Sequence, residues 1–168
     1  MNIGLINRGD SIIIDANIII YAIQKESEQC KNLLLKCAEE EINGILPVHI
    51  LAEVMHILMI SEARDNGWIT GSNPAKQLSE KPDRVRQLLR YENLMKDLMS
   101  INLNIISLKQ EDFLTTMRIQ REFGLLTNDA LLVAVSERLR VQGIASADKR
   151  FGLVSGKILY SPDDITYK

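Results

Sequence analysis

The sequence lacks the features of a membrane-bound, secreted or strongly basic protein. No apolar run approaches the ~20 residues that a membrane-spanning helix needs, and the first ten residues hold no apolar segment of signal-peptide length. The net charge is −2 and the isoelectric point about 5.7, which argues against binding to duplex DNA by charge alone. We therefore expect a cytoplasmic protein that does not associate with membranes.

Cysteine is also scarce, and the two cysteines are predicted to be reduced thiols. Cys30 and Cys37 fall on one apolar face of a predicted helix over residues 28–41. Seven residues of helix separate their Cα atoms by about 10 Å, which exceeds the span of a disulfide. A reducing cytoplasm agrees with this expectation.

The chain does contain enough apolar material for one folded domain. Its 168 residues are 46% hydrophobic and 25% charged, proportions typical of soluble globular proteins. The sequence shows no repeat, no low-complexity tract and no linker that would divide it. We predict a single domain over residues 1–168, with an insertion around residues 68–90.

An isoleucine run near the N-terminus organises the predicted fold. Residues 12–14 are consecutive isoleucines, which favour a short strand buried on both faces. The run ends at Asp15, so the strand would carry this carboxylate at its C-terminal end. Loops and helix N-termini converge at that edge of an open α/β sheet, and binding sites form there.

Short strands alternate with helices along the rest of the chain. This alternation predicts parallel βαβ units and an α/β fold in three layers, α/β/α, with a central parallel sheet. Further strands are predicted at residues 45–46, 103–108, 144–147 and 157–160, and helices at residues 17–24, 28–41, 49–65, 110–123 and 127–140.

The middle of the chain gives a less regular pattern. Residues 68–81 have weak periodicity and several turn-forming residues, which predicts an extended loop or a small helical insertion. One long helix is predicted to follow Pro82 and Asp83. Its expected core residues are Val85, Leu88, Leu89, Leu94, Leu98 and Met99.

Four carboxylates occupy equivalent positions in this pattern. Asp15 and Asp148 follow strands directly, whereas Glu53 and Asp129 lie in the first turns of helices that come after strands. Because the carboxyl ends of parallel strands meet at one edge of a sheet, the topology should bring all four side chains there. Their negative charges repel one another unless a cation joins them.

These oxygen ligands are the type that Mg²⁺ and Mn²⁺ prefer. Such ions activate water and stabilise the charge that develops on a phosphodiester during hydrolysis. The sequence therefore predicts a metal-dependent phosphodiester hydrolase. Its catalytic and metal-binding residues would be Asp15, Glu53, Asp129 and Asp148.

The motifs around these carboxylates resemble the ordered motifs of the PIN domain family. They are IIIDAN at residues 12–17, LAEV at residues 51–54, LTNDAL at residues 126–131 and IASADKRF at residues 144–151. The resemblance covers nearly the whole chain and implies a Mg²⁺- or Mn²⁺-dependent ribonuclease site in a three-layer fold. It also implies polar side chains beside the acidic cluster, at Asn17, Thr127 and Ser146.

Many small prokaryotic members of that family are VapC-like toxins, which act as dimers and are held inactive by an antitoxin. The resemblance thus implies an endoribonuclease toxin with RNA as substrate, an antitoxin protein as partner and a homodimeric state. Single-stranded or looped RNA is the expected substrate because its bases are exposed. Lys149 and Arg150 directly follow Asp148 and are the expected contacts to the phosphate backbone.

Apolar residues beyond the needs of one helix stripe also favour a homodimer, with its interface near residues 49–65 or the insertion. The surplus consists of Ile19, Ile20, Ile23, Leu58 and Met59.

Several alternatives are open from the sequence alone. Asn17 and Thr127 could simply cap helices, and Ser146 could be a turn residue. The chain could be a PIN-like RNA-processing nuclease that is not a toxin, a binding or scaffold module with little catalysis, or a phosphatase with an aspartyl nucleophile. A zinc site could form on one helix face, from His49, Glu53 and His56.

Overall fold

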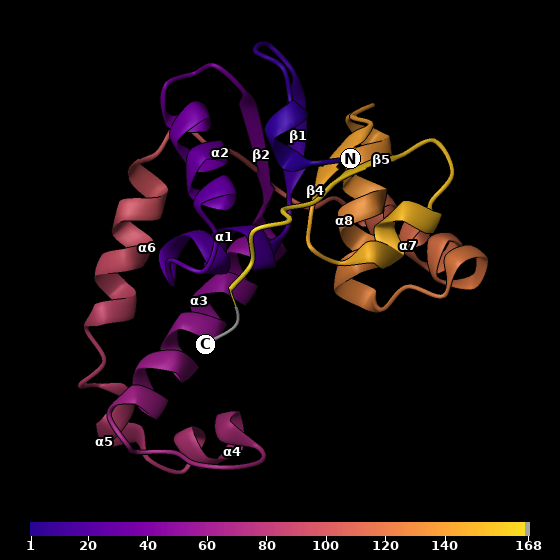
Figure 1. The fold of residues 1–168 in the computed structure, drawn as a ribbon. Helices are drawn as coiled ribbons and strands as arrows, with labels where there is room; N and C mark the ends of the chain where they lie inside the picture. The colour runs from indigo at the N-terminus through magenta and orange to yellow at the C-terminus, as the bar shows by residue number, and fades with distance from the viewer. Residues whose placement is uncertain (167–168) are drawn as a thin grey trace. The chain divides into compact units, whose positions relative to one another are not determined.

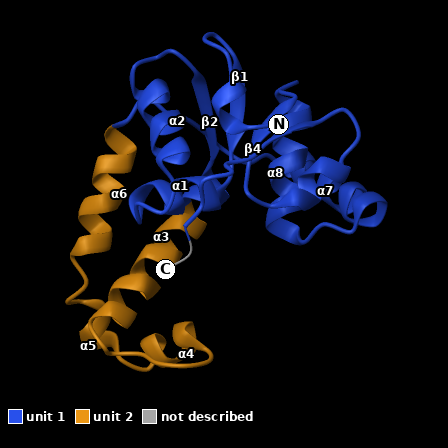
Figure 2. Ribbon diagram, in the orientation of Figure 1, with its two compact units in different colours: residues 1–51, 101–168 blue, residues 52–100 orange. Residues whose placement is uncertain are grey.

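A five-stranded parallel sheet forms the centre of the first of two compact units (Figures 1 and 2). The computed structural model describes residues 1–166, and the first unit comprises residues 1–51 and 101–168. Its strands lie in the order β3-β2-β1-β4-β5. They are β1 (Ser11–Ile14), β2 (Asn43–Pro47), β3 (Asn104–Ile106), β4 (Gly143–Ala145) and β5 (Ile158–Tyr160).

The strand order places helices on both faces of this sheet. Two helices, α1 (Ala16–Ile23) and α2 (Glu28–Ala38), connect β1 to β2, and the chain moves toward the β3 edge. Two others, α7 (Gln110–Phe123) and α8 (Thr127–Arg138), connect β3 to β4 in the opposite direction. Because parallel crossovers are right-handed, opposite directions put the two helix pairs on opposite faces (Figure 1). The predicted three-layer α/β/α fold is confirmed.

The central strand β1 is buried on both faces, as its isoleucine run predicts. Ile12, Ile13 and Ile14 are at most 1% exposed. β1 pairs with β2 on one side and with β4 on the other. The chain leaves β1 and enters β4 on opposite sides of the sheet, so their carboxyl ends mark the switch point where α/β proteins place their sites.

A glycine permits the close pairing of β1 with β4. Gly143 lies opposite Ile12 in the strand register. A Cβ atom at position 143 would lie only 2.8 Å from the Cδ1 atom of Ile12. The side chain of Ile12 thus occupies the space that any larger residue at this position would need.

The predicted cysteine face of α2 is confirmed. Ser27 caps this helix by accepting a hydrogen bond from the backbone N–H of Cys30 at 3.0 Å. Cys30 and Cys37 are both free thiols with no exposed surface. Burial raises the pKa of each thiol to about 11, so both stay protonated at neutral pH.

A buried ion pair joins α7 to α8 on the other face of the sheet. Asp112 Oδ1 accepts a hydrogen bond from Arg138 Nε at 2.7 Å, and its Oδ2 accepts one from Lys109 N at 2.8 Å. Burial alone would raise the pKa of Asp112, but these hydrogen bonds outweigh burial and hold the pKa below its usual range.

The second compact unit comprises residues 52–100 and has a small core of its own (Figure 2). It contains most of α3 (Val48–Asp65), together with α4 (Pro74–Ser79), α5 (Pro82–Val85) and α6 (Arg90–Ser100). Ala63, Ile69, Leu78 and Leu88 form the buried cluster. The guanidinium of Arg84 lies over the ring of Trp68, 5.0 Å from its centroid. Residues 68–81 are predicted to form a loop or a small helical insertion, and the structure places α4 there. That residues 68–90 as a whole are an insertion in the domain stays a prediction.

The prediction of one long helix after Pro82 is wrong. The chain forms α5, leaves helical geometry and starts α6 at Arg90. The carboxylate of Glu62 explains the break, because it accepts the backbone N–H of Leu89 (3.0 Å), Arg90 (3.1 Å) and Tyr91 (2.7 Å). These donors are the unpaired N–H groups of a new helix terminus, so Glu62 caps α6 from another helix.

The break also changes which residues are buried. Leu88 and Leu98 are buried as predicted, but Leu89 and Met99 are 62% and 50% exposed. The inward stripe of α6 instead includes Met95, which is 2% exposed. A helix that restarts at Arg90 has its own phase, and a single periodicity cannot describe both segments.

The predicted surplus of apolar residues is largely absorbed within the chain. Ile19, Ile20 and Leu58 are all buried, so they do not supply an exposed interface. These residues therefore give little support to a dimer interface, and the homodimer stays a prediction. In residues 1–166, no helix combines the length and apolar character that crossing a bilayer requires.

Replacing Glu62 with Gln should lower the free energy of unfolding by about 1–3 kcal/mol, because charge-assisted hydrogen bonds to a helix terminus become neutral ones. The three backbone donors outweigh burial and lower the pKa of Glu62. A depressed folded-state pKa stabilises the protein above the unfolded-state value, about 4.3, and this contribution is lost as pH falls through the folded-state pKa. Urea unfolding at pH 7 and at successively lower pH measures both effects.

The control is Glu92→Gln, which removes an exposed carboxylate that pairs with Lys96 on the same helix at 2.6 Å. Its cost should stay below about 0.5 kcal/mol. Equal losses in the two variants would show that Glu62 is not the cap of α6.

Candidate active site

Asp15 stands at the junction of β1 and α1 and is nearly buried, at 7% exposure. Its Oδ1 atom accepts the backbone N–H of Ala16 at 2.7 Å, which makes Asp15 the N-cap of α1. Its Oδ2 atom accepts hydrogen bonds from Asn17 Nδ2 and Ser146 Oγ, both at 2.6 Å. These donors fix the orientation of the carboxylate without neutralising its charge.

Ser146 joins the ends of the two central strands. It is fully buried and follows Ala145, which pairs with Ile14 in the register of β1 and β4. Besides donating to Asp15, its Oγ atom accepts hydrogen bonds from Asn17 Nδ2 (3.1 Å) and from the backbone N–H of Asp148 (2.9 Å). Ser146 is therefore the central member of this network and more than a turn residue.

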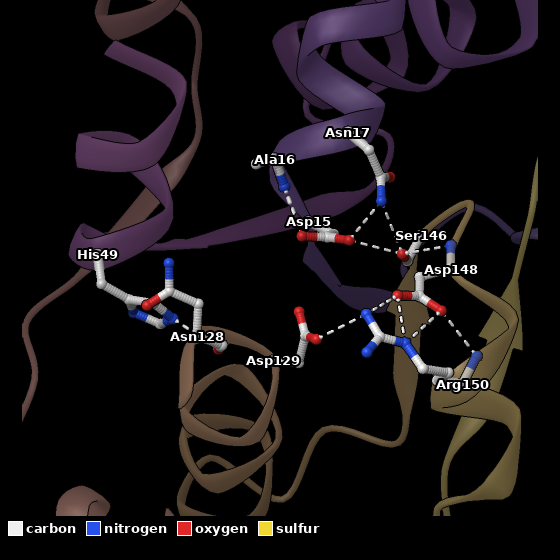
Figure 3. A network of polar contacts seen from close by, with 9 residues as sticks. All are labelled: Asp15, Ala16, Asn17, His49, Asn128, Asp129, Ser146, Asp148 and Arg150. Atoms are coloured by element: carbon white, nitrogen blue, oxygen red, sulfur yellow. Dashed lines mark hydrogen bonds and ion pairs between the residues drawn. The ribbon is translucent and has the colours of Figure 1, made fainter. Parts of the chain in front are cut away.

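Asn17 belongs to the same network and does not cap α1. Its Oδ1 atom accepts the backbone N–H of Ala147 at 3.1 Å, while its Nδ2 group donates to Asp15 and Ser146. The amide thus bridges the first turn of α1 and the segment after β4 (Figure 3).

Asp148 is the N-cap of the short 3₁₀ helix η2 (Lys149–Leu153) and forms an ion pair with Arg150 of that helix. Its Oδ1 atom accepts the backbone N–H of Arg150 at 2.9 Å. The guanidinium of Arg150 also contacts both carboxylate oxygens, with Nε 2.9 Å from Oδ2 and 3.1 Å from Oδ1. The hydrogen bonds from Arg150 lower the pKa of Asp148 and outweigh the opposing effect of its partial burial.

Asp129 reaches the same guanidinium from the first turn of α8. Its Oδ2 atom lies 3.1 Å from Nη2 of Arg150, so one arginine bridges Asp129 and Asp148 (Figure 3). The pKa of Arg150 is raised mainly by its bonds to Asp148, then by the charges of Asp129 and Asp15. Three of the four predicted carboxylates therefore act on one cation.

Two predicted residues have different surroundings. Thr127 is the first residue of α8, and its Oγ1 atom accepts a hydrogen bond from Gln120 Nε2 at 3.2 Å. Leu126 occupies the N-cap position, so the interpretation of Thr127 as a cap is wrong, and its role beside the acidic cluster stays a prediction. Lys149 is exposed at the start of η2, where a contact to phosphate also stays a prediction.

The remaining predicted carboxylate, Glu53, lies on α3 within the second compact unit. Its approach to the three aspartates stays a prediction. His49 precedes it on α3, in the first unit, and its Nε2 atom lies 3.3 Å from the carbonyl oxygen of Asn128 (Figure 3). This contact gives no support to the zinc alternative.

The chemistry of this edge fits a hard divalent cation. Asp15, Asp129 and Asp148 offer the carboxylate oxygens that Mg²⁺ and Mn²⁺ prefer. A positive group already lies between two of them, since Arg150 contacts both. Within residues 1–166, no three acidic, histidine or cysteine side chains are arranged around one point as ligands, so the ligand geometry stays a prediction.

Sequence reasoning missed two contacts of this site. Arg150 pairs with the site's own carboxylates, a contact that the sequence did not predict, and its contact to substrate phosphate stays a prediction. The D-x-R spacing after a strand was the available signal, because a 3₁₀ turn folds the residue at i+2 back toward its N-cap. Ser161 donates a hydrogen bond to the carbonyl oxygen of Ser146 at 2.7 Å, and no local pattern reveals a contact between residues this distant in the chain.

The fold and the site together define an α/β protein with carboxylates gathered at the switch point of its sheet. The family model described as the PIN domain matches residues 12–157, so the chain belongs to the PIN domain family. PIN domains are nucleases, which places this chain among the hydrolases that act on nucleic acid. No curated protein gives a significant sequence match.

Solved structures share this fold at low sequence identity. The structure of VapBC2 from Rickettsia felis bound to a DNA fragment from their promoter matches with a TM-score of 0.59 and 16% identity, over 91% of this chain and 99% of that chain. A toxin-antitoxin complex from Klebsiella pneumoniae matches with a TM-score of 0.58 and 16% identity, over 88% and 95%. PAE2754 from Pyrobaculum aerophilum matches with a TM-score of 0.55 and 17% identity, over 89% of each chain.

Ser146→Ala should lower the free energy of unfolding by about 1–3 kcal/mol, because the buried oxygen of Asp15 loses a donor and the N–H of Asp148 loses its acceptor. Urea denaturation measures this loss. The matched control is Ser136→Ala, which removes an equally buried hydroxyl whose hydrogen bond goes to Val133 O within its own helix. A loss for Ser146→Ala no larger than for Ser136→Ala would contradict the role of Ser146 as the link between the strands.

Proposed function

We propose that this PIN domain is a Mg²⁺- or Mn²⁺-dependent endoribonuclease. The observation that carries the proposal is the grouping of Asp15, Asp129 and Asp148 around a single cationic group at the switch point of the sheet. Crowded carboxylates oppose folding unless a cation offsets them, and a structural role alone gives no reason to assemble them. PIN domain nucleases generally use divalent metals, and the donors at this edge are of the type such metals take.

Each residue then has a distinct role. Asp15, Asp129 and Asp148, joined by Glu53 from α3, would hold the ion. When bound, a divalent ion supplies Lewis-acid chemistry, which makes water more acidic and offsets charge on the phosphodiester. Asn17 and Ser146 fix the orientation of Asp15 through the hydrogen bonds described above. Lys149, exposed beside Asp148, would contact the phosphate backbone of a single-stranded or looped RNA.

We further propose that the protein is the toxin of a VapC-like toxin–antitoxin pair and acts in the cytoplasm. Two of the similar structures come from toxin–antitoxin complexes, and each aligns over at least 95% of its own length. At 16% identity this likeness establishes only the fold, and the role as a toxin is our proposal. The alternative is a PIN-domain nuclease that processes RNA without being a toxin.

Asp129→Asn should reduce metal-dependent cleavage of a labelled single-stranded RNA at least about 100-fold, because it removes one ligand charge while keeping the shape of the side chain. The stability of the metal-free protein should change by less than about 1 kcal/mol, since the lost ion pair to Arg150 is partly exposed. Added Mn²⁺ should raise the melting temperature of the parent more than that of the variant.

The matched control is Asp65→Asn, which removes a carboxylate that also pairs with an arginine, Arg90, on the surface. This variant should cleave RNA like the parent. Should Asp129→Asn melt well below the metal-free parent and still cleave at the parental rate, Asp129 is structural and the assignment of the site is wrong.

Induced expression of the parent in a bacterial host should slow growth, and expression of Asp129→Asn to the same level should not. The physical reason is that growth arrest by a nuclease toxin requires the cleavage chemistry. Growth curves with immunoblots for protein level measure the effect. Normal growth with the parent, combined with RNA cleavage in vitro, would reject the toxin role and favour the RNA-processing alternative.

A further inference from the structure

Arg150 contacts Asp129 and Asp148, two of the carboxylates that the proposed function takes as ligands of a metal ion. Its guanidinium contacts both oxygens of Asp148 and one oxygen of Asp129, and the charge of Asp15 acts on it as well. The arginine thus stands where a divalent cation would make its bonds to Asp129 and Asp148.

The guanidinium of Arg150 is partly exposed, and the backbone of η2 does not depend on its contacts. Asp148 accepts the backbone N–H of Arg150, so the main chain at η2 is held independently of the guanidinium. The side chain of Arg150 is 49% exposed, and those of Asp129 and Asp148 are 21% and 25% exposed. The guanidinium can therefore swing into solvent without unpacking the core or moving the backbone of η2.

A divalent ion and the guanidinium of Arg150 would compete for these oxygens. Both take lone pairs of Asp129 and Asp148, and two positive charges at contact distance repel each other. The neighbouring carboxylate, Asp15, accepts hydrogen bonds from the neutral groups of Ala16, Asn17 and Ser146. These three hydrogen bonds fix its orientation and add no positive charge.

The geometry points to Arg150 as a built-in competitor for the divalent ion. In the metal-free protein its guanidinium holds Asp129 and Asp148 together, and it must leave both carboxylates when an ion binds. Arg150 therefore sets how tightly the site binds metal. This inference rests on the proposed function, since it takes the aspartates as the metal ligands, and it assigns a role that the substrate-contact prediction for Arg150 does not include.

Calorimetric titration of the metal- and RNA-free protein with Mn²⁺ tests this role directly. Arg150→Gln keeps a polar side chain and the backbone N–H but removes the charge and the guanidinium, and it should bind Mn²⁺ about three- to tenfold more tightly than the parent. Arg150→Lys keeps the charge but lacks the planar fork, so its affinity should lie between those of the parent and Arg150→Gln. The rise in melting temperature on adding Mn²⁺ should follow the same order.

Lys149→Gln is the matched control, because it removes one positive charge from the adjacent exposed position. It should change Mn²⁺ affinity by less than about twofold, since an exposed charge is screened by solvent and salt. An equal gain for Lys149→Gln and Arg150→Gln would mean that net charge alone sets the affinity, and would overturn the inference.

The remaining outcomes separate this inference from the proposed function. Unchanged or weaker Mn²⁺ binding by Arg150→Gln, with a parent that binds Mn²⁺ and cleaves RNA, would show that Arg150 supports the ligands instead of competing with the ion. That result overturns only the role of Arg150. Failure of the parent and every variant to bind Mn²⁺ at millimolar concentration would overturn both the inference and the metal dependence of the proposed function.

Discussion

The pairing of β1 with β4 is the constraint on which the rest of the site depends. It places Asp15 beside Ser146, although the two are 131 positions apart in the chain. The isoleucine run makes β1 the buried centre of the sheet, and Gly143 leaves the space that Ile12 needs in the register. Once the strands are paired, Ser146 orients both Asp15 and the backbone of Asp148, and the first turn of η2 then directs Arg150 back over the site.

The negative charges of the three aspartates are stabilised in two different ways. Asp15 is buried and accepts hydrogen bonds from the neutral groups of Ala16, Asn17 and Ser146, which fix its orientation. Asp129 and Asp148 are more exposed and share a cation that belongs to the chain. Neutral donors add no charge to the site, whereas the shared guanidinium offsets part of the negative charge of Asp129 and Asp148.

The second compact unit shows where periodicity fails as a guide. The apolar residues after Pro82 fit one helix, yet the carboxylate of Glu62 ends that helix and begins another at Arg90. A carboxylate on a distant helix leaves no mark in the local pattern, because capping residues are normally sought next to the helix that they cap. The burial of Met95, and the exposure of Leu89, follow from this one contact.

The sequence by itself determined the succession of strands and α-helices in the first unit, the buried central strand and the positions of the carboxylates along the chain. Those features follow from local patterns, namely a β-branched run, alternating periodicities, and acidic residues directly after two strands and in the first turns of two helices. Only the tertiary structure decided that Asp15 caps α1 while Asn17 and Ser146 fix it in place, and that Arg150 binds Asp129 and Asp148. The reason is physical: these hydrogen bonds and ion pairs depend on side-chain directions at the strand ends, and those directions exist only after β1 and β4 have paired.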